Sequence, residues 1–221
     1  MSDTLPMFPL NTVLFPGVTI PLHVFEDRYR ALVHHLLSIE DPAERLFGTV
    51  AIREGYEVGD HGAQSLYRVG VRMQLTEVES NEDGTFEITA TARDRIVLDG
   101  LETSGEFAQG EITDSPDDPV DGPTALHDRA RATFTAYRAA ISEIQGTTFS
   151  GSLPRDPGYL SWTLAALAPL PMAERQALLE AESPEARLEL VTTLLREELR
   201  AINVIPSLPA TDVARTAWSP N

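Results

Sequence analysis

The chain of 221 residues is 42% hydrophobic, so it can bury a core in one large domain or in two small ones. Seventeen basic and 34 acidic side chains give a formal net charge of −17, which repels nucleic acids and other polyanions. Cysteine and lysine are both absent, which excludes disulfides, thiolate chemistry, cysteine-based zinc sites, Schiff bases and Walker-type lysines.

The N-terminal segment mixes apolar residues with prolines at positions 6, 9, 16 and 21. Because proline lacks an N–H group, we expect short strands here, at the edges and corners of a small, irregular barrel. The period then changes to that of a helix, because five apolar residues share one helical face: Tyr29, Leu32, Val33, Leu36 and Leu37. No basic flank precedes the first apolar run, and no run approaches the roughly 20 apolar residues that span a membrane. We therefore expect a soluble, cytoplasmic protein without a signal peptide.

From Leu5 to about Thr113 the pattern is mostly that of β-strands. Apolar residues recur at every second position on both sides of a predicted turn at 81–84: Val69, Val71, Met73 and Leu75, then Phe86, Ile88, Ala90 and Ala92. The pattern continues at Ile96 and Leu98, and Phe107 and Ile112 predict a last strand. Residues 55–62 are rich in glycine and predict an exposed loop.

The second half of the chain is predicted to be helical. An acidic, proline-rich linker at 116–123 precedes it, and three prolines interrupt the spacing that an EF-hand-like calcium loop would need. One helix carries an apolar stripe formed by Leu126, Ala130, Phe134, Tyr137, Ile141 and Ile144. Shorter helices are expected at 159–166 and 173–181. Ser183, Pro184 and Glu185 are typical of a helix start, and the helix that they open is expected to end before Pro206.

These patterns predict an α+β protein with four parts. They are a β-rich domain (1–115), the linker (116–123), a helical domain (124–205) and a loose tail (206–221).

Four segments of the chain are distinctive together: the proline-punctuated opening that ends in Phe25-Glu26-Asp27-Arg28-Tyr29, then residues 47–52, 93–96 and 160–162. In these segments the chain resembles the Lon substrate-binding domain, the N-terminal domain of Lon-type ATP-dependent proteases. The resemblance runs from about residue 5 to residue 202. It implies a PUA-like β pseudo-barrel with one inserted helix, followed by an α-helical bundle. The Ser–Lys dyad and the P-loop of Lon proteases both need a lysine, and this sequence has none. We therefore expect a stand-alone form of the domain, without the ATPase and protease domains.

No group of residues predicts catalysis, a metal site or a cofactor. His34 and His35 are adjacent, so they cannot form an i, i+4 metal-binding pair. Ser150 and Ser152 lack the context of a nucleophile elbow. Glu26 and Asp27 lie at a predicted helix N-terminus, where negative charge is favourable without any catalytic role. We therefore expect a protein that is not an enzyme.

The resemblance implies recognition of unfolded or apolar polypeptide segments, with a protease or a chaperone as a partner, and with no nucleic acid or membrane. Such a site needs an apolar groove edged by aromatic residues. The candidates for a polypeptide-binding groove are Phe25, Tyr29, Tyr67, Tyr159 and Trp162. For each of them the competing explanation is ordinary packing in the core or between the barrel and the bundle.

Two other functions stay open. A PUA-like RNA-binding module would fit the predicted β fold, although the net charge of −17 and the lack of an arginine cluster disfavour it. A hydrolase with an unrecognised site is the third alternative, and turnover that a point mutant abolishes would reveal it.

Overall fold

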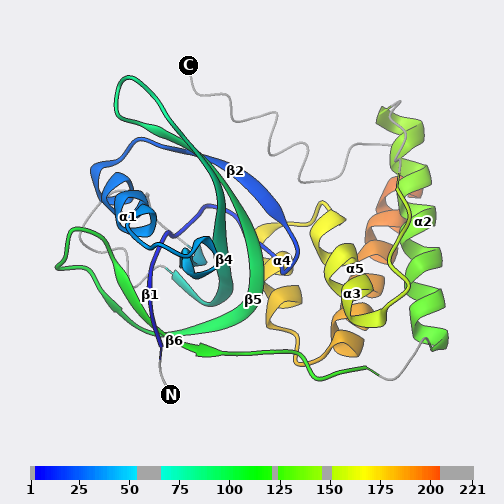
Figure 1. Cartoon of the computed structure of the whole chain (residues 1–221). Helices are drawn as coiled ribbons and strands as arrows, with labels where there is room; N and C mark the ends of the chain where they lie inside the picture. Colours follow the sequence, from blue (N-terminus) through cyan, green and yellow to red (C-terminus); the bar gives the residue numbers. More distant parts are fainter. Residues whose placement is uncertain (1–2, 54–65, 121–123, 146–150, 205–221) are drawn as a thin grey trace. The chain divides into compact units, whose positions relative to one another are not determined.

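The computed structural model describes residues 3–53, 66–120, 124–145 and 151–204 (Figure 1). The chain divides into two compact units, the barrel unit (Met1–Pro116) and the helical unit (Asp117–Asn221). The boundary falls within the segment that the sequence predicts as a linker. The predicted loop at 55–62 and the predicted tail at 206–221 lie outside the described residues.

The barrel unit is built from six strands: β1 (Asp3–Pro6), β2 (Thr19–Val24), β3 (Leu46–Ile52), β4 (Leu66–Ser80), β5 (Phe86–Glu102) and β6 (Gln109–Asp114). All pairs are antiparallel, in the order β1-β6-β5-β4-β3, and β2 pairs with β5. The segment after β1 runs alongside β3, where the Phe8 N–H donates to the Gly48 carbonyl (2.8 Å) and the Leu10 N–H to the Val50 carbonyl (3.1 Å). These bonds join the two ends of the sheet, which closes as a small barrel (Figure 1).

The closure depends on two long, bent strands. β4 and β5 contain 15 and 17 residues, and their pairing shifts register between Val71 and Met73 and again between Leu75 and Glu77. Such irregularities increase strand twist and bend the ladder, which a narrow barrel requires. The turn between them ends at Gly84, whose φ of +80° favours glycine.

The proline in β2 is consistent with the position of this strand at an edge of the sheet. Pro21 lies opposite Thr89 in the β2–β5 pair, and in the described strands β2 pairs with β5 alone. An edge strand tolerates proline because the missing N–H can face away from the ladder. The expectation of short, proline-containing strands at the sheet edge is met here.

The barrel interior is filled by the alternating residues of the predicted strands. Phe47, Val71, Met73, Ile88 and Ile96 are almost completely buried. Burying one such side chain stabilises a fold by about 1.5–3 kcal/mol before the entropy cost of ordering it. Gly70 marks the tightest approach, because a Cβ there would lie 2.0 Å from the Thr49 carbonyl oxygen of the neighbouring strand.

One helix, α1 (Asp27–Leu37), is inserted between β2 and β3, and a short 3-10 helix, η1 (Pro42–Glu44), follows it. The Glu26 carbonyl accepts from the N–H groups of Tyr29 (3.0 Å) and Arg30 (2.9 Å), which starts α1. Four of the five predicted apolar residues are buried: Tyr29, Leu32, Val33 and Leu36. Leu37 instead is 36% exposed, because the eighth position after Tyr29 has rotated to the edge of the buried face.

The helical unit contains α2 (Ala125–Gln145), α3 (Pro157–Leu167), α4 (Met172–Glu180) and α5 (Pro184–Val204). Side chains from α2 (Phe134 and Tyr137), α3 (Leu164) and α5 (Leu188 and Leu195) are all buried. The Asp156 carboxylate accepts from the Tyr159 N–H (2.9 Å) at the start of α3, and Ser183 Oγ accepts from the Ala186 N–H (3.1 Å) at the start of α5. These caps satisfy N–H groups that a helix otherwise leaves unpaired.

The predicted α+β fold, a barrel with one inserted helix followed by a helical bundle, is confirmed. One boundary differs, because β6 begins at Gln109 and Phe107 therefore belongs to the loop before it. In the described residues, no helix is both long and apolar enough to cross a membrane.

Candidate functional site

A groove on the barrel unit lies between α1 and the loop that joins β5 to β6. Its walls come from Asp27, Arg28, Ala31, His34, His35 and Ser38 of the α1 region and from Glu106 and Phe107 of the loop. Asp27, Ala31, His35 and Ser38 follow one another at helical spacing, so they form a continuous stripe that faces away from the buried side of α1. The groove is open to solvent, and its volume of about 690 Å³ lies within the range of ligand-binding pockets.

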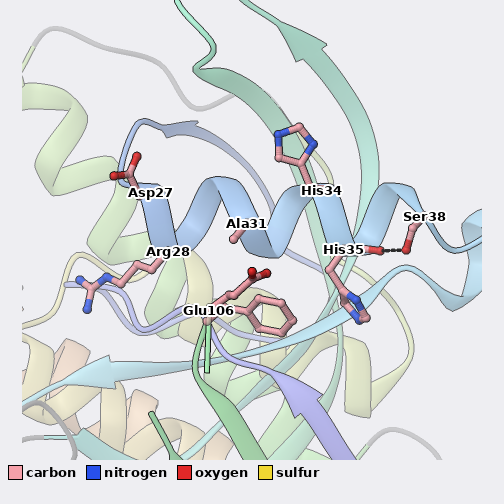
Figure 2. A pocket seen from close by; sticks show the side chains of 8 residues that line it. Asp27, Arg28, Ala31, His34, His35, Ser38 and Glu106 are labelled. Carbon is pink, nitrogen blue, oxygen red and sulfur yellow. Dashed lines mark hydrogen bonds between the residues drawn. The ribbon is translucent and has the colours of Figure 1, made fainter. Parts of the chain in front are cut away.

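The centre of the groove is small and apolar. Ala31 contributes only a methyl group, which leaves space between the larger side chains on either side of it along the helix. Phe107 is half-buried and its ring centroid lies 5.1 Å from that of His35. Figure 2 shows the Glu106 side chain reaching toward α1 near Ala31. The groove therefore combines an aromatic wall with a carboxylate at its edge.

Most charges next to the groove are already paired. Asp27 Oδ1 accepts from Arg30 Nη1 at 3.0 Å, and Glu26 Oε2 accepts from Arg28 Nε at 2.9 Å. The Arg28 guanidinium also lies 4.5 Å from the centroid of the Tyr29 ring. Glu106 differs, because its exposed carboxylate has no hydrogen-bond or ion-pair partner among the described residues. The groove therefore carries one uncompensated negative charge.

The histidines at the far end of the groove are held by ring contacts. His34 packs edge-on against Phe86 of β5, with 5.1 Å between the centroids and 83° between the planes. The His35 carbonyl accepts from Ser38 Oγ at 2.6 Å. Both side chains are exposed, so they offer hydrogen-bonding groups to a bound molecule.

Two of the aromatic candidates lie near the start of α1, and they differ in exposure. Phe25 is 61% exposed and stacks on the His23 ring at 5.8 Å. Tyr29 is buried and stacks on Phe8 at 4.0 Å with 11° between the planes, so its ring helps to fix α1 on the barrel. Tyr67, on β4, is half-buried and lies 5.6 Å from the Arg53 guanidinium.

The other two candidates belong to the helical unit, on α3. Tyr159 is 71% exposed, whereas the half-buried Trp162 ring lies 3.1 Å from the guanidinium carbon of Arg187. The five aromatic residues are thus divided between the two units, and their grouping in one groove stays a prediction. None of the five lines the groove on α1.

Sequence reasoning did not find the groove residues of the β5–β6 loop. Glu106 and Phe107 stand about 70 positions after α1, and no local pattern places them beside it. The available signal was weak, namely an aromatic residue between Gly105 and Gly110 in an otherwise polar stretch.

In the residues that the structure describes, no group of three or more His, Asp or Glu side chains is placed to hold a metal ion. The groove on α1 holds two carboxylates, those of Asp27 and Glu106, and among the described residues Asp27 is hydrogen-bonded to Arg30.

Comparison with known proteins gives a consistent result. Residues 4–197 match the family described as the ATP-dependent protease La (LON) substrate-binding domain. Among curated proteins, Lon protease 2 of Syntrophobacter fumaroxidans is 26% identical over 210 residues, and the match covers 92% of this chain and 26% of that protein. Lon protease of Elusimicrobium minutum is 29% identical over 203 residues, with 88% and 23% covered. The chain therefore spans about a quarter of the length of these relatives.

Two solved structures share the fold. The Lon N-terminal domain protein from Xanthomonas campestris aligns with a TM-score of 0.64 and 24% identity, over 86% of this chain and 98% of that chain. The N-terminal domain of the Mycobacterium avium complex Lon protease aligns with a TM-score of 0.60 and 15% identity, over 88% and 98%.

Proposed function

Since the chain belongs to the Lon substrate-binding domain family, we propose that it recognises unfolded or apolar polypeptide segments and does so without catalysing a reaction of its own. The observation that carries the proposal is an open groove, with an apolar centre at Ala31 and Phe107, on the part of the chain that matches the family. This role needs a partner that receives the bound polypeptide, and we propose a protease or a chaperone as that partner.

The groove suits an extended polypeptide better than a compact ligand. It runs along the stripe from Asp27 to Ser38, and a helix rises about 1.5 Å per residue. The stripe is therefore roughly 16 Å long, enough for about five residues of extended chain at 3.3 Å each. Aromatic contact at Phe107 and hydrogen-bonding groups at His34, His35 and Ser38 supply the two kinds of interaction that peptide grooves use.

The charge of the barrel unit favours polypeptide over nucleic acid. Residues 1–116 contain 20 acidic side chains and 8 arginines, a formal net charge of −12. Binding RNA would place phosphates in this negative field, without the cluster of cations that normally neutralises them.

Fluorescence anisotropy with a labelled, reduced and alkylated polypeptide that cannot fold tests the proposal. The same polypeptide in its folded form and a single-stranded RNA oligonucleotide serve as comparisons. We expect saturable binding of the unfolded form alone. Replacing Phe107 by Ala should weaken this binding about 5- to 30-fold, as for loss of an aromatic contact of about 1–2 kcal/mol.

The matched control is Leu37→Ala, which removes an exposed apolar side chain of α1 that does not line the groove. This variant should bind like the wild type. Binding of RNA but not of unfolded polypeptide would refute the proposed function.

A further inference from the structure

We infer that the groove on α1 selects polypeptide segments in which a lysine or arginine stands next to an aromatic or large aliphatic residue, with the Glu106 carboxylate receiving the cation. The inference rests on the proposed function and adds the chemistry of the bound segment. It comes from the distribution of charge and apolar surface around Ala31 and Phe107.

The first step is the free carboxylate. Asp27 and Glu26 are each engaged by an arginine, whereas Glu106 has no partner among the described residues. A carboxylate gains from an incoming cation when no partner is displaced, and the gain falls as solvent exposure increases. Among the acidic groups at the groove, Glu106 can therefore pair with a cationic ligand without the loss of an existing ion pair.

The second step is the proximity of this carboxylate to apolar surface. Glu106 and Phe107 are consecutive residues in the loop, and the Glu106 side chain reaches toward the methyl group of Ala31 (Figure 2). Lysine and arginine carry apolar stems that pack on such surface while the charged end reaches a carboxylate. A neighbouring aromatic or aliphatic side chain of the segment fits the space over Ala31 and against Phe107.

The third step is the long-range field. The net charge of −12 on residues 1–116 attracts cationic segments and repels acidic ones before contact, and it does so most strongly at low salt. The field alone gives a general preference for positive charge. The local pair at Glu106 gives a preference for positive charge at one position of the bound segment.

The experiment uses three labelled peptides of equal length that differ at one residue beside a common Phe, where they carry Lys, Gln or Glu. Binding to the full chain is measured by anisotropy. We expect the affinity order Lys, Gln, Glu, with about a 2- to 5-fold step between the first two, the size of an exposed ion pair. The preference should fade at about 0.5 M salt, where charges more than a few ångströms apart are screened.

Two variants separate the local pair from the general field. Glu106→Gln and Glu82→Gln each remove one negative charge from the exposed surface of the barrel unit, but Glu82 lies in the turn between β4 and β5 and does not line the groove. Glu106→Gln should abolish the difference between the Lys and Gln peptides, and Glu82→Gln should keep it. A chemical-shift change at the Ala31 methyl group on peptide addition should accompany binding.

The outcomes are distinguishable. If all three peptides bind equally to the wild type, or if the two variants behave alike, the inference is overturned while the proposed function stands. If no peptide binds, the proposed function fails and the inference fails with it.

Discussion

Asp117 accepts two parallel hydrogen bonds from the guanidinium of Arg187, one at 2.8 Å from Nη1 and one at 2.9 Å from Nη2, across 70 positions of sequence. Arg187 has no exposed surface. Two further N–H groups of Arg187 are hydrogen-bonded, because Nε donates to the Leu178 carbonyl (3.1 Å) and Nη1 also donates to Ser161 Oγ (2.8 Å). A fully buried cation on α5 thus holds the first residue of the helical unit against the bundle.

Removing the carboxylate should destabilise the helical unit strongly. Asp117→Ala leaves the buried charge of Arg187 without a counterion, and breaking a buried pair on one side costs about 3–5 kcal/mol. Urea unfolding followed by circular dichroism measures the loss. Asp118→Ala is the matched control, because the neighbouring side chain is exposed and its loss should cost less than about 0.5 kcal/mol. Equal effects of the two variants would contradict this account of Arg187.

The close approach of β3 and β4 predicts a second large effect. In Gly70→Ala the added Cβ would lie 2.0 Å from a backbone oxygen, that of Thr49, and 2.7 Å from Val50 Cγ1. The backbone must move apart, so we expect a loss of about 3 kcal/mol or more of unfolding free energy. In the control Gly105→Ala the nearest atom lies at 3.4 Å, and thermal melting should be nearly unchanged. A Gly70→Ala variant as stable as the wild type would show that this strand spacing is wrong.

Local patterns in the sequence were sufficient for the elements of this fold. Alternation at Val71, Met73 and Leu75 predicts the buried face of β4, and Ser183 predicts the start of α5 because its side chain can cap an N–H group. Proline at position 21 predicts an edge strand for the same kind of local reason.

The site was harder to predict, because it depends on contacts between distant parts of the chain. Nothing near Glu106 and Phe107 in sequence indicates that they lie beside Ala31. The burial of Arg187 is equally hidden, since arginine is almost never fully buried unless it is paired, and its partner Asp117 belongs to a segment that the sequence predicts as a linker.

A pH effect is expected at the interface of α4 and α5. The pKa of Glu174 is raised above its usual 4.5, first by burial and then by the negative charges of Glu198 and Glu197. A raised pKa in the folded state means that the folded chain binds this proton more tightly than the unfolded chain. The contribution of Glu174 to stability is therefore fully present below pH 4.5 and is lost as the pH rises through the raised value.

Glu174→Gln removes the charge and should increase the melting temperature at neutral pH. The increase should shrink as the pH falls toward 4.5, because the wild-type carboxyl group is then protonated too. Melting curves of the two proteins across this range measure the difference. Glu182→Gln, an exposed acidic residue of the same unit, is the control for the change in net charge. A difference that does not depend on pH would contradict the assigned cause.

Trp162 and Tyr159 both lie on α3, and their different surroundings predict different effects on stability when each is mutated. The Trp162 ring stacks on the buried Arg187 guanidinium, so Trp162→Ala removes both packing and a cation–π contact and should cost about 3–4 kcal/mol. Tyr159 is 71% exposed, so Tyr159→Ala should change stability by less than about 0.5 kcal/mol.

Two measurements on each variant separate stability from binding. Urea unfolding gives the free energy of unfolding, and fluorescence anisotropy with a labelled unfolded polypeptide gives the affinity of the folded protein. If Trp162→Ala keeps full stability but loses binding, the ring is a contact for polypeptide and the packing role argued from Arg187 is wrong. If Tyr159→Ala weakens binding at unchanged stability, the binding surface includes the exposed end of α3. An exposed aromatic side chain that does not stabilise the fold can affect affinity only by contacting the bound polypeptide.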